Sequence, residues 1–230
     1  FSNITPQEMV LNSGIWVMME QWCRYWAKQQ KAKEFSNFRV FNGCIPDDKL
    51  TTLSVGDRTI EVNIPTHFYK VVLCRSKKKE LANNIYVCCF FIPNRPIDPT
   101  NQQNQNLSNW LIPLTVLQEK TNIDFIPFLK YYYEYKENVH QLLNIKELFG
   151  DITLEISDML KTQLLKSKWY GIIAYSQTLE QLEENWKELH SIKEDINHDI
   201  GFHEEFYHYV KLKLTGSNIT PFPSKKQPEE

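Results

Sequence analysis

The sequence predicts an α+β fold, in which an antiparallel sheet with helices is followed by a small helical module. Two runs, at 60–74 and 85–94, are rich in the β-branched and aromatic residues that are typical of strands. The charged turn "RSKKKELANN" lies between them, which predicts an antiparallel hairpin. After about residue 140 the strand-like runs stop, and helical periodicity takes over.

The N-terminal part contains the first predicted helix, over residues 12–33. Asn12 and Ser13 offer side-chain oxygens of the kind that cap helices. Apolar residues then recur at helical spacing, which predicts a helix with an apolar side. These residues are Ile15, Met18, Met19 and Trp22.

The rest of this unit is predicted from the glycine, the proline and the polar segment that interrupt its apolar runs. Gly43 and the residues after it indicate a strand end that passes into a turn, and Pro65 marks an edge or a bulge. Residues 94–109 are polar and low in complexity, so we expect a surface loop there. Residues 110–129 predict a short helix and a return to the core.

The C-terminal part is predicted to consist of helices. Ser176 or Thr178 is the expected cap of one helix, and Gly216 is the expected end of the last. We expect the apolar stripe from Leu179 to Ile192 to dock on the first unit. The domain prediction is therefore 1–139 for the α+β unit, 140–216 for the helical module and 217–230 for a disordered tail.

Composition excludes several classes of protein. The 230 residues carry a formal net charge of −2, so no global basic field indicates nucleic acid. The five cysteines form no CxxC pair, which argues against a zinc site or a disulfide framework and favours reduced thiols in a reducing compartment. No run approaches the ~18 apolar residues of a membrane span.

The N-terminal helix carries a candidate chemical site. Asn12, Trp16, Glu20 and Arg24 are spaced by four, so they form a slowly drifting stripe on a helix. An amide oxygen binds Mg²⁺ well, a later Glu can hold its waters, and an Arg can bind a phosphate. This set suits phosphodiester hydrolysis. The alternative stays open: Asn12 is an N-cap, and Glu20 with Arg24 is a surface pair worth ~0.3–0.5 kcal/mol.

The resemblance of several segments to a known family bears on the choice between a metal site and an ordinary cap with a surface ion pair. The segments "SNITPQ", "LNSGIW" and "EQWCR" resemble the DNA/RNA non-specific endonucleases, the ββα-metal nuclease family that includes the endonuclease G type. The segments "FNGCIP", "IPTHFYKVVL", "FIPNRPI" and "NIDFIPFL" follow in the family's order, with Asn42 and Cys44 departing from its pattern. The resemblance covers about residues 1–129. It is closest to the mitochondrial exo/endonuclease branch, whose helical extension the C-terminal module also resembles.

The resemblance implies roles for individual residues. It makes Asn12 the protein ligand of a catalytic Mg²⁺, with Mn²⁺ as an alternative ion, and Glu20 the carboxylate that orients metal-bound water. Arg24 completes the catalytic set. Asn3 and Gln7 line the substrate site. Lys28 is a candidate from its position alone, because it continues the predicted helix beyond Arg24 and could extend a track for phosphates. The implied substrates are DNA and RNA, with no small-molecule cofactor.

The resemblance also implies a general-base histidine in an Asp-Arg-Gly-His segment upstream of Asn3. We therefore expect the chain to be a fragment without this base, and nearly inactive alone, because general acid–base catalysis contributes ~10²–10⁴-fold. The family implies a mitochondrial homodimer with endonuclease activity, 5′–3′ exonuclease activity, or both. The alternative function is a catalytically inactive paralogue that binds nucleic acid or a protein through the helical module.

Overall fold

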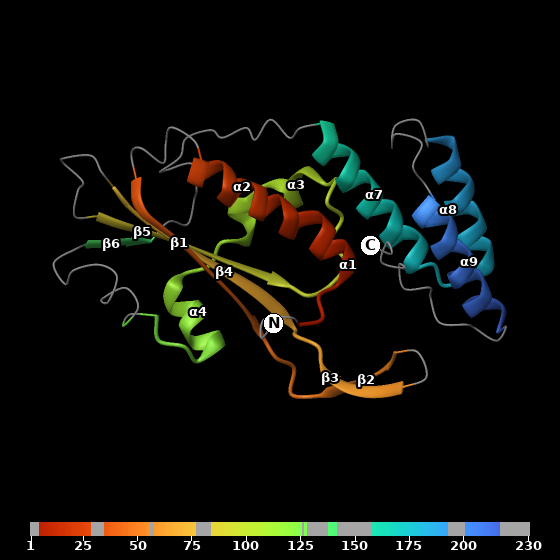
Figure 1. Ribbon diagram of the computed structural model, residues 1–230, viewed down its shortest axis with the longest axis horizontal. Helices are drawn as coiled ribbons and strands as arrows, with labels where there is room; N and C mark the ends of the chain where they lie inside the picture. Colours follow the sequence, from red (N-terminus) through yellow and green to blue (C-terminus); the bar gives the residue numbers. More distant parts are fainter. Residues whose placement is uncertain are drawn as a thin grey trace, which may run out of the picture.

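The computed structural model describes residues 5–28, 35–55, 58–76, 84–125, 127, 138–141, 158–192 and 201–216. The predicted disordered tail and Asn3 lie outside the described residues. Within these ranges the chain forms a sheet with helices on both faces and a group of three helices at one end (Figure 1). The predicted α+β class is confirmed.

The main sheet has the strand order β1-β4-β5-β6. Its predicted hairpin is confirmed, because β4 pairs antiparallel with β5 from His67 opposite Pro93 to Arg75 opposite Ile85. β1 is antiparallel to β4, and β6 is parallel to β5. The strands are β1 Phe35–Ile45, β4 His67–Ser76, β5 Asn84–Pro93 and β6 Asn138–Gln141.

A second, two-stranded ribbon interrupts the run predicted at 60–74. β2 (Leu50–Val55) pairs with β3 (Arg58–Asn63), and the ribbon projects away from the main sheet (Figure 1). Pro65, which has no backbone N–H to donate, lies between β3 and β4. The proline therefore divides what the composition predicted as one strand.

Helices cover both faces of the main sheet. The first helical stretch consists of α1 (Met9–Leu11), a π-helical segment η1 (Asn12–Trp16) and α2 (Val17–Lys28). It lies on the face opposite α4 (Leu114–Thr121) (Figure 1). Side chains of β4 alternate between two cores, as the period of a strand requires. Phe68, Val72 and Cys74 pack beneath α2, and Tyr69, Val71 and Leu73 pack with Leu117 and Phe125.

The helix predicted at 12–33 begins earlier and is broken. Its N-cap is Glu8, whose carboxylate accepts a hydrogen bond from the backbone N–H of Leu11 at 2.7 Å. The backbone leaves helical geometry at Gly14, with φ −106° and ψ −106°. Asn12 already has helical backbone angles, so the alternative in which it is the N-cap is wrong.

The predicted surface loop at 94–109 is more ordered than its composition suggests. It contains α3 (Gln102–Gln105) and a 3₁₀ turn η4 (Leu107–Trp110). The side chains of Asn101 and Asn106 cap these turns, because an Asn oxygen can accept from the backbone N–H two residues later. Many amides in this segment therefore serve its own backbone.

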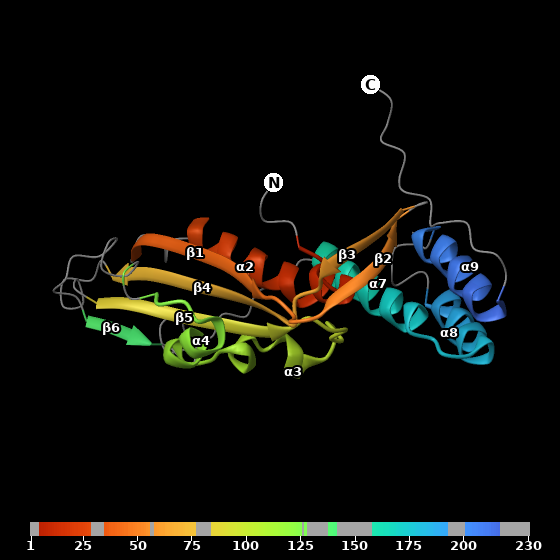
Figure 2. The same ribbon diagram turned by 90° about the horizontal axis from the view of Figure 1, so that it is seen from below.

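The C-terminal module consists of α7 (Asp158–Ala174), α8 (Leu179–Ser191) and α9 (Gly201–Thr215), grouped at one end of the sheet (Figure 2). Thr178 caps α8, and Gly216 follows α9 with a φ of 68°, as predicted. The predicted boundary between residues 139 and 140 falls within β6. The division into domains stays a prediction.

Within the described residues, the apolar stripe of α8 packs inside the module and not on the first unit. Leu182 and Leu189 are fully buried against α7 and α9, so the expectation was wrong. The helix that contacts the first unit is α7, which packs on α1 and η1. α7 has apolar residues on several sides because it lies between two cores. Leu164 belongs to the core beneath α2, and Trp169 and Ile173 belong to the core of the module.

The cysteines are free thiols, as the sequence predicts. Cys23, Cys74, Cys88 and Cys89 are buried. Burial raises the pKa of the Cys23 thiol to about 11 and that of Cys74 to about 12. These thiols are therefore protonated side chains of the core.

Candidate active site

Asn12 lies at the point where the first helical stretch changes from α-helix to π-helix. Its backbone N–H donates to the carbonyl of Glu8 at 2.9 Å and to that of Met9. Its side chain is exposed, and no hydrogen bond to it is found among the described residues. The carboxamide is therefore not used for capping or packing, and its oxygen is available to a ligand.

Gly14 explains why the helix can change its winding at this point. A Cβ on Gly14 would lie 2.9 Å from Cβ of Pro99 and 3.6 Å from Oγ of Ser167. The missing side chain lets the turn approach the loop after β5 and helix α7. π-helical turns are rare and are frequent at functional sites. This turn carries Asn12 at its first position.

Asn94 holds the segment that leads into Asn12. Its Oδ1 accepts from the backbone N–H of Glu8 at 2.7 Å, and its Nδ2 donates to the carbonyl of Pro65 at 2.8 Å and to that of Pro6 at 3.3 Å. One side chain thus ties the end of β5 to the approach of α1 and to the residue pair before β4. Sequence reasoning quoted Asn94 only within "FIPNRPI" and did not identify this role.

Gln7 lies in the segment that Asn94 holds. Its side chain is partly buried, and its Nε2 is buried without an acceptor among the described residues. A buried N–H that lacks an acceptor is costly. Gln7 therefore offers a donor to a polar group that would bind beside it.

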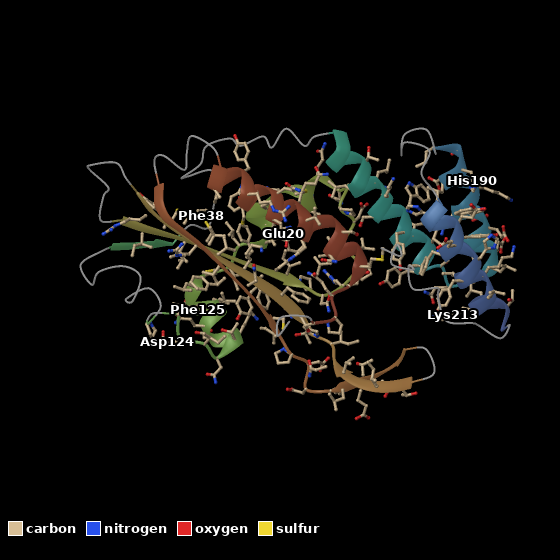
Figure 3. All side chains as sticks on the ribbon, in the orientation of Figure 1. Glu20, Phe38, Asp124, Phe125, His190 and Lys213 are labelled. Carbon is tan, nitrogen blue, oxygen red and sulfur yellow. The ribbon has the colours of Figure 1, made fainter. Side chains whose placement is uncertain are left out.

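Glu20 and Arg24 lie further along α2. Nη2 of Arg24 is 3.4 Å from Oε2 of Glu20, and the side chains are 59% and 39% exposed, respectively. Such a pair contributes little to stability, so both groups can exchange partners when an ion or a phosphate arrives. Trp16, between them and Asn12, is buried with its ring edge-on to Phe68. Figure 3 labels Glu20 on α2, on the opposite side of the sheet from Asp124 and Phe125.

Lys70 is a residue near the site that sequence reasoning missed. It lies on β4, only 2% exposed, on the face that α2 covers. Its Nζ donates to Oδ1 of Asn42 at 2.5 Å and lies 4.4 Å from the centre of the Trp16 ring. Burial lowers the pKa of Lys70, while the carboxylate of Glu20 opposes that shift and Arg24 adds to it. A lysine inside the run "FYKVV" is the sequence signal that marks this position.

The donors in this region fit a hard divalent cation. Asn12 supplies one neutral oxygen, and Glu20 supplies a carboxylate about two turns further along. In the part of the chain that the structure describes, no group of three or more His, Cys, Asp and Glu could hold a metal. An ion at Asn12 would therefore take most of its ligands from water and phosphate, as Mg²⁺ usually does.

The predicted site residues are placed as follows. Gln7, Asn12, Glu20 and Arg24 all lie on the helical stretch or its approach, and only Glu20 and Arg24 contact each other directly. Lys28 is the last residue of α2, and the structure describes only its backbone. Asn3 lies outside the described residues altogether.

The helical stretch that carries Asn12, Glu20 and Arg24 lies within a part of the chain that matches a known family. The profile of the DNA/RNA non-specific endonuclease family matches residues 1–130, and the chain belongs to this family. The chain is similar to the mitochondrial nuclease EXOG of Danio rerio, with 29% identity over 137 residues that cover 56% of this chain and 36% of that protein. It is also similar to nuclease C1 of Cunninghamella echinulata var. echinulata, with 30% identity over 54% of this chain and 46% of that protein.

These comparisons confirm the family that the sequence motifs predicted, including its mitochondrial exo/endonuclease branch as a relative. The chain spans less than half the length of these two curated relatives. Among solved structures it is similar to a chain of the EndoG/EndoGI complex, with a TM-score of 0.39, 22% identity, and coverage of 54% of this chain and 48% of that one. Within the described residues, no helix has the length and apolar character needed to cross a membrane.

Proposed function

We propose that this chain carries the metal-binding and phosphate-binding part of an Mg²⁺-dependent nuclease that hydrolyses phosphodiester bonds in DNA and RNA. The observation that supports this most directly is the exposed side chain of Asn12, which lies within the family match and takes no part in capping. Family membership supports the nuclease activity. The metal and the individual roles are the proposal.

Each polar residue has a distinct task in this proposal. Oδ1 of Asn12 holds the ion, and the carboxylate of Glu20 accepts hydrogen bonds from water around it. Arg24 exchanges its weak contact with Glu20 for a phosphate, to which a guanidinium can donate two hydrogen bonds. Gln7 donates its free N–H to the substrate, and Lys28 and Asn3 extend the phosphate contacts. When bound, Mg²⁺ supplies stabilisation of the negative charge that develops on the phosphate oxygens.

The proposal assigns the general base to a histidine of an Asp-Arg-Gly-His segment, which the 230 residues do not contain. His67 is a poor substitute. Its ring stacks on Phe91 with centroids 4.4 Å apart, and burial, Lys120 and Arg95 lower its pKa. We expect these 230 residues alone to bind DNA and Mg²⁺ with little cleavage. A chain that also contains the histidine segment is expected to cleave.

The relatives support finer proposals about the whole protein. Similarity to a mitochondrial nuclease supports a mitochondrial location. The same branch of the family supports a homodimer and a 5′–3′ exonuclease tendency. Light scattering of the purified protein and a comparison of circular with linear DNA test these two points separately.

Substitution of Asn12 tests the proposed metal ligand. In a chain that contains the histidine segment, Asn12→Ala should lower turnover by about two to three orders of magnitude, as for the loss of one well-placed stabilising group. Mg²⁺-dependent cleavage and the melting temperature are measured on the same protein. Because Glu8 caps the helix, Asn12→Ala should change the melting temperature little. Asn12→Asp, which keeps an oxygen, should retain more metal affinity.

A matched control is Asn101→Ala. The Asn101 side chain accepts from the backbone N–H of Gln103 at 2.9 Å and caps α3. Its loss should cost ~0.5–2 kcal/mol of stability and leave cleavage by each folded molecule unchanged. An Asn12→Ala protein that cleaves DNA as fast as its parent would contradict the assigned ligand.

A further inference from the structure

Helix α7 reaches the turn that carries Asn12 through one buried hydroxyl group. Ser167 is only 4% exposed, and its Oγ lies 2.7 Å from Oγ of Ser13 and 3.3 Å from the carbonyl oxygen of Val10. Oγ of Ser13 in turn lies 2.7 Å from the carbonyl oxygen of Met9. These contacts lie on both sides of Asn12 in the sequence.

The protons of the two hydroxyls determine the direction of this chain. Each serine hydroxyl has one proton to donate. Ser13 donates to the carbonyl of Met9, so at the 2.7 Å contact between the two serines Ser167 is the donor and Ser13 the acceptor. The carbonyl of Val10, 3.3 Å from Oγ of Ser167, is a second acceptor for the same proton. The result is a relay of hydrogen bonds from α7 to Ser13 to Met9. The Met9 carbonyl also accepts from the backbone N–H of Asn12.

Two further contacts from α7 and its C-terminal end meet the same turn. A Cβ on Gly171 would lie 2.7 Å from Cγ2 of Val10, so the glycine allows the close approach of α7. The hydroxyl of Tyr175 donates to Oε1 of Glu8 at 2.8 Å, while Oε2 of Glu8 caps α1. Burial and this hydrogen bond raise the pKa of Tyr175. Hydroxyls of the helical module therefore contact the residues on either side of Asn12.

We infer that the helical module is a positioning element of the active site, and that Ser167 is the residue through which α7 holds the Asn12 turn in its metal-binding geometry. This inference rests on the proposed function of Asn12. The inference gives the helical module a role in positioning the Asn12 side chain for the metal. Ser167 itself is a positioning residue, because it acts through Ser13 and does not touch the reacting groups.

The test compares two buried serines of the same module. Ser176 is 5% exposed, donates to the carbonyl of Ile172 at 3.0 Å and accepts from Asn185 at 3.1 Å, so both of its partners belong to the helical module. The full 230-residue chain is prepared as Ser167→Ala and as Ser176→Ala. Mn²⁺ affinity is measured by electron paramagnetic resonance with a short DNA oligonucleotide present. Amide hydrogen exchange is measured over residues 8–16.

We expect Ser167→Ala to weaken Mn²⁺ binding by about three- to tenfold, the equivalent of one lost hydrogen bond, and to speed exchange over residues 8–16. Ser176→Ala should change neither quantity, although it lowers the melting temperature by a similar amount. If Asn12→Ala weakens Mn²⁺ binding but Ser167→Ala behaves like Ser176→Ala, the inference is overturned and the proposed function stands. If Asn12→Ala leaves Mn²⁺ binding unchanged, the proposed ligand is wrong, and so is a metal-positioning role for Ser167.

Discussion

Glu8 and Asn12 have different roles at the start of the first helical stretch, which runs from α1 through η1 to α2. Both side chains carry oxygens that are able to cap a helix, and Glu8 takes this task. Its carboxylate is supported from outside the helix by Tyr175, and its backbone N–H is held by Asn94. Because Glu8 satisfies the helix end, the side-chain amide of Asn12 is not needed as a cap.

Lys70 is the other residue whose role depends on its surroundings. Burying an ammonium group costs free energy unless it is well paired, and the partners of Lys70 are an amide oxygen and the face of a ring. The stem of the side chain packs in the core while the charge lies under α2. The charge of Lys70 interacts with those of Glu20 and Arg24 on α2, so it contributes to the electrostatics of the candidate site.

Lys70→Met tests the stability cost of this buried charge. At neutral pH the variant should be as stable as the parent or up to ~1–2 kcal/mol more stable, because a similar volume is kept without the charge. The pKa of Lys70 is lowered in the folded state. Between that lowered pKa and the unfolded value, the unfolded chain binds more protons, so the stability of the parent rises with pH. The advantage of the variant should therefore shrink as pH rises through this window.

Urea unfolding of both proteins at several pH values from 7 to about 10 checks this. Lys70→Ala is the comparison that removes the stem as well, and it should be clearly less stable than Lys70→Met. A Lys70→Met protein that is destabilised by several kcal/mol at neutral pH would show that the charge itself holds the sheet and α2 together.

At the scale of elements, the pairing of β1 with β4 depends on a glycine. Gly43 lies opposite Tyr69 in the antiparallel register, and a Cβ on Gly43 would overlap the Tyr69 ring. An aromatic side chain often covers a glycine on a neighbouring strand in this way. The ring then packs edge-on to Phe125 with centroids 6.2 Å apart, so the glycine also sets the core beneath α4.

Gly43→Ala should destabilise the protein by ~1–3 kcal/mol, because the Tyr69 ring must leave its position. The effect is measured by thermal and denaturant unfolding. In a Tyr69→Leu background the same substitution should cost much less, since the overlapping ring is gone. Equal costs in both backgrounds would show that Tyr69 is not the source of the effect.

At the scale of the whole molecule, α7 joins two hydrophobic cores. Leu164 is 2% exposed in the core beneath α2, while Ile173 is fully buried in the core of the module with Leu182. Lys168 adds an ion pair with Asp98 of the loop after β5, with 3.8 Å between charged atoms. A helix shared in this way should couple the unfolding of the sheet and the module.

Leu164→Ala should therefore lower the stability of both parts together, by ~2–5 kcal/mol for a buried leucine. Calorimetry should show one transition at a lower temperature, and hydrogen exchange should speed up in β4 and in α8 alike. Leu182→Ala removes a buried leucine from the core of the module, and the coupling predicts that it too gives one transition at a lower temperature. A calorimetric trace in which Leu164→Ala separates the two parts into distinct transitions would contradict the coupling.

The sequence alone was enough to predict the family, the β4–β5 hairpin, the end of α9 at Gly216 and, as one of two candidates, the cap of α8 at Thr178. These features are predictable because their signals lie within a few neighbouring residues. Only the tertiary structure decided that Glu8 caps the first helical stretch, since the partners of Glu8 are Asn94 and Tyr175, 86 and 167 residues away. It also decided that α7 docks in place of α8, and that Ser167 meets Ser13 across 154 residues. Helical periodicity shows that a helix has an apolar side, but the partner of that side is chosen by packing between distant segments.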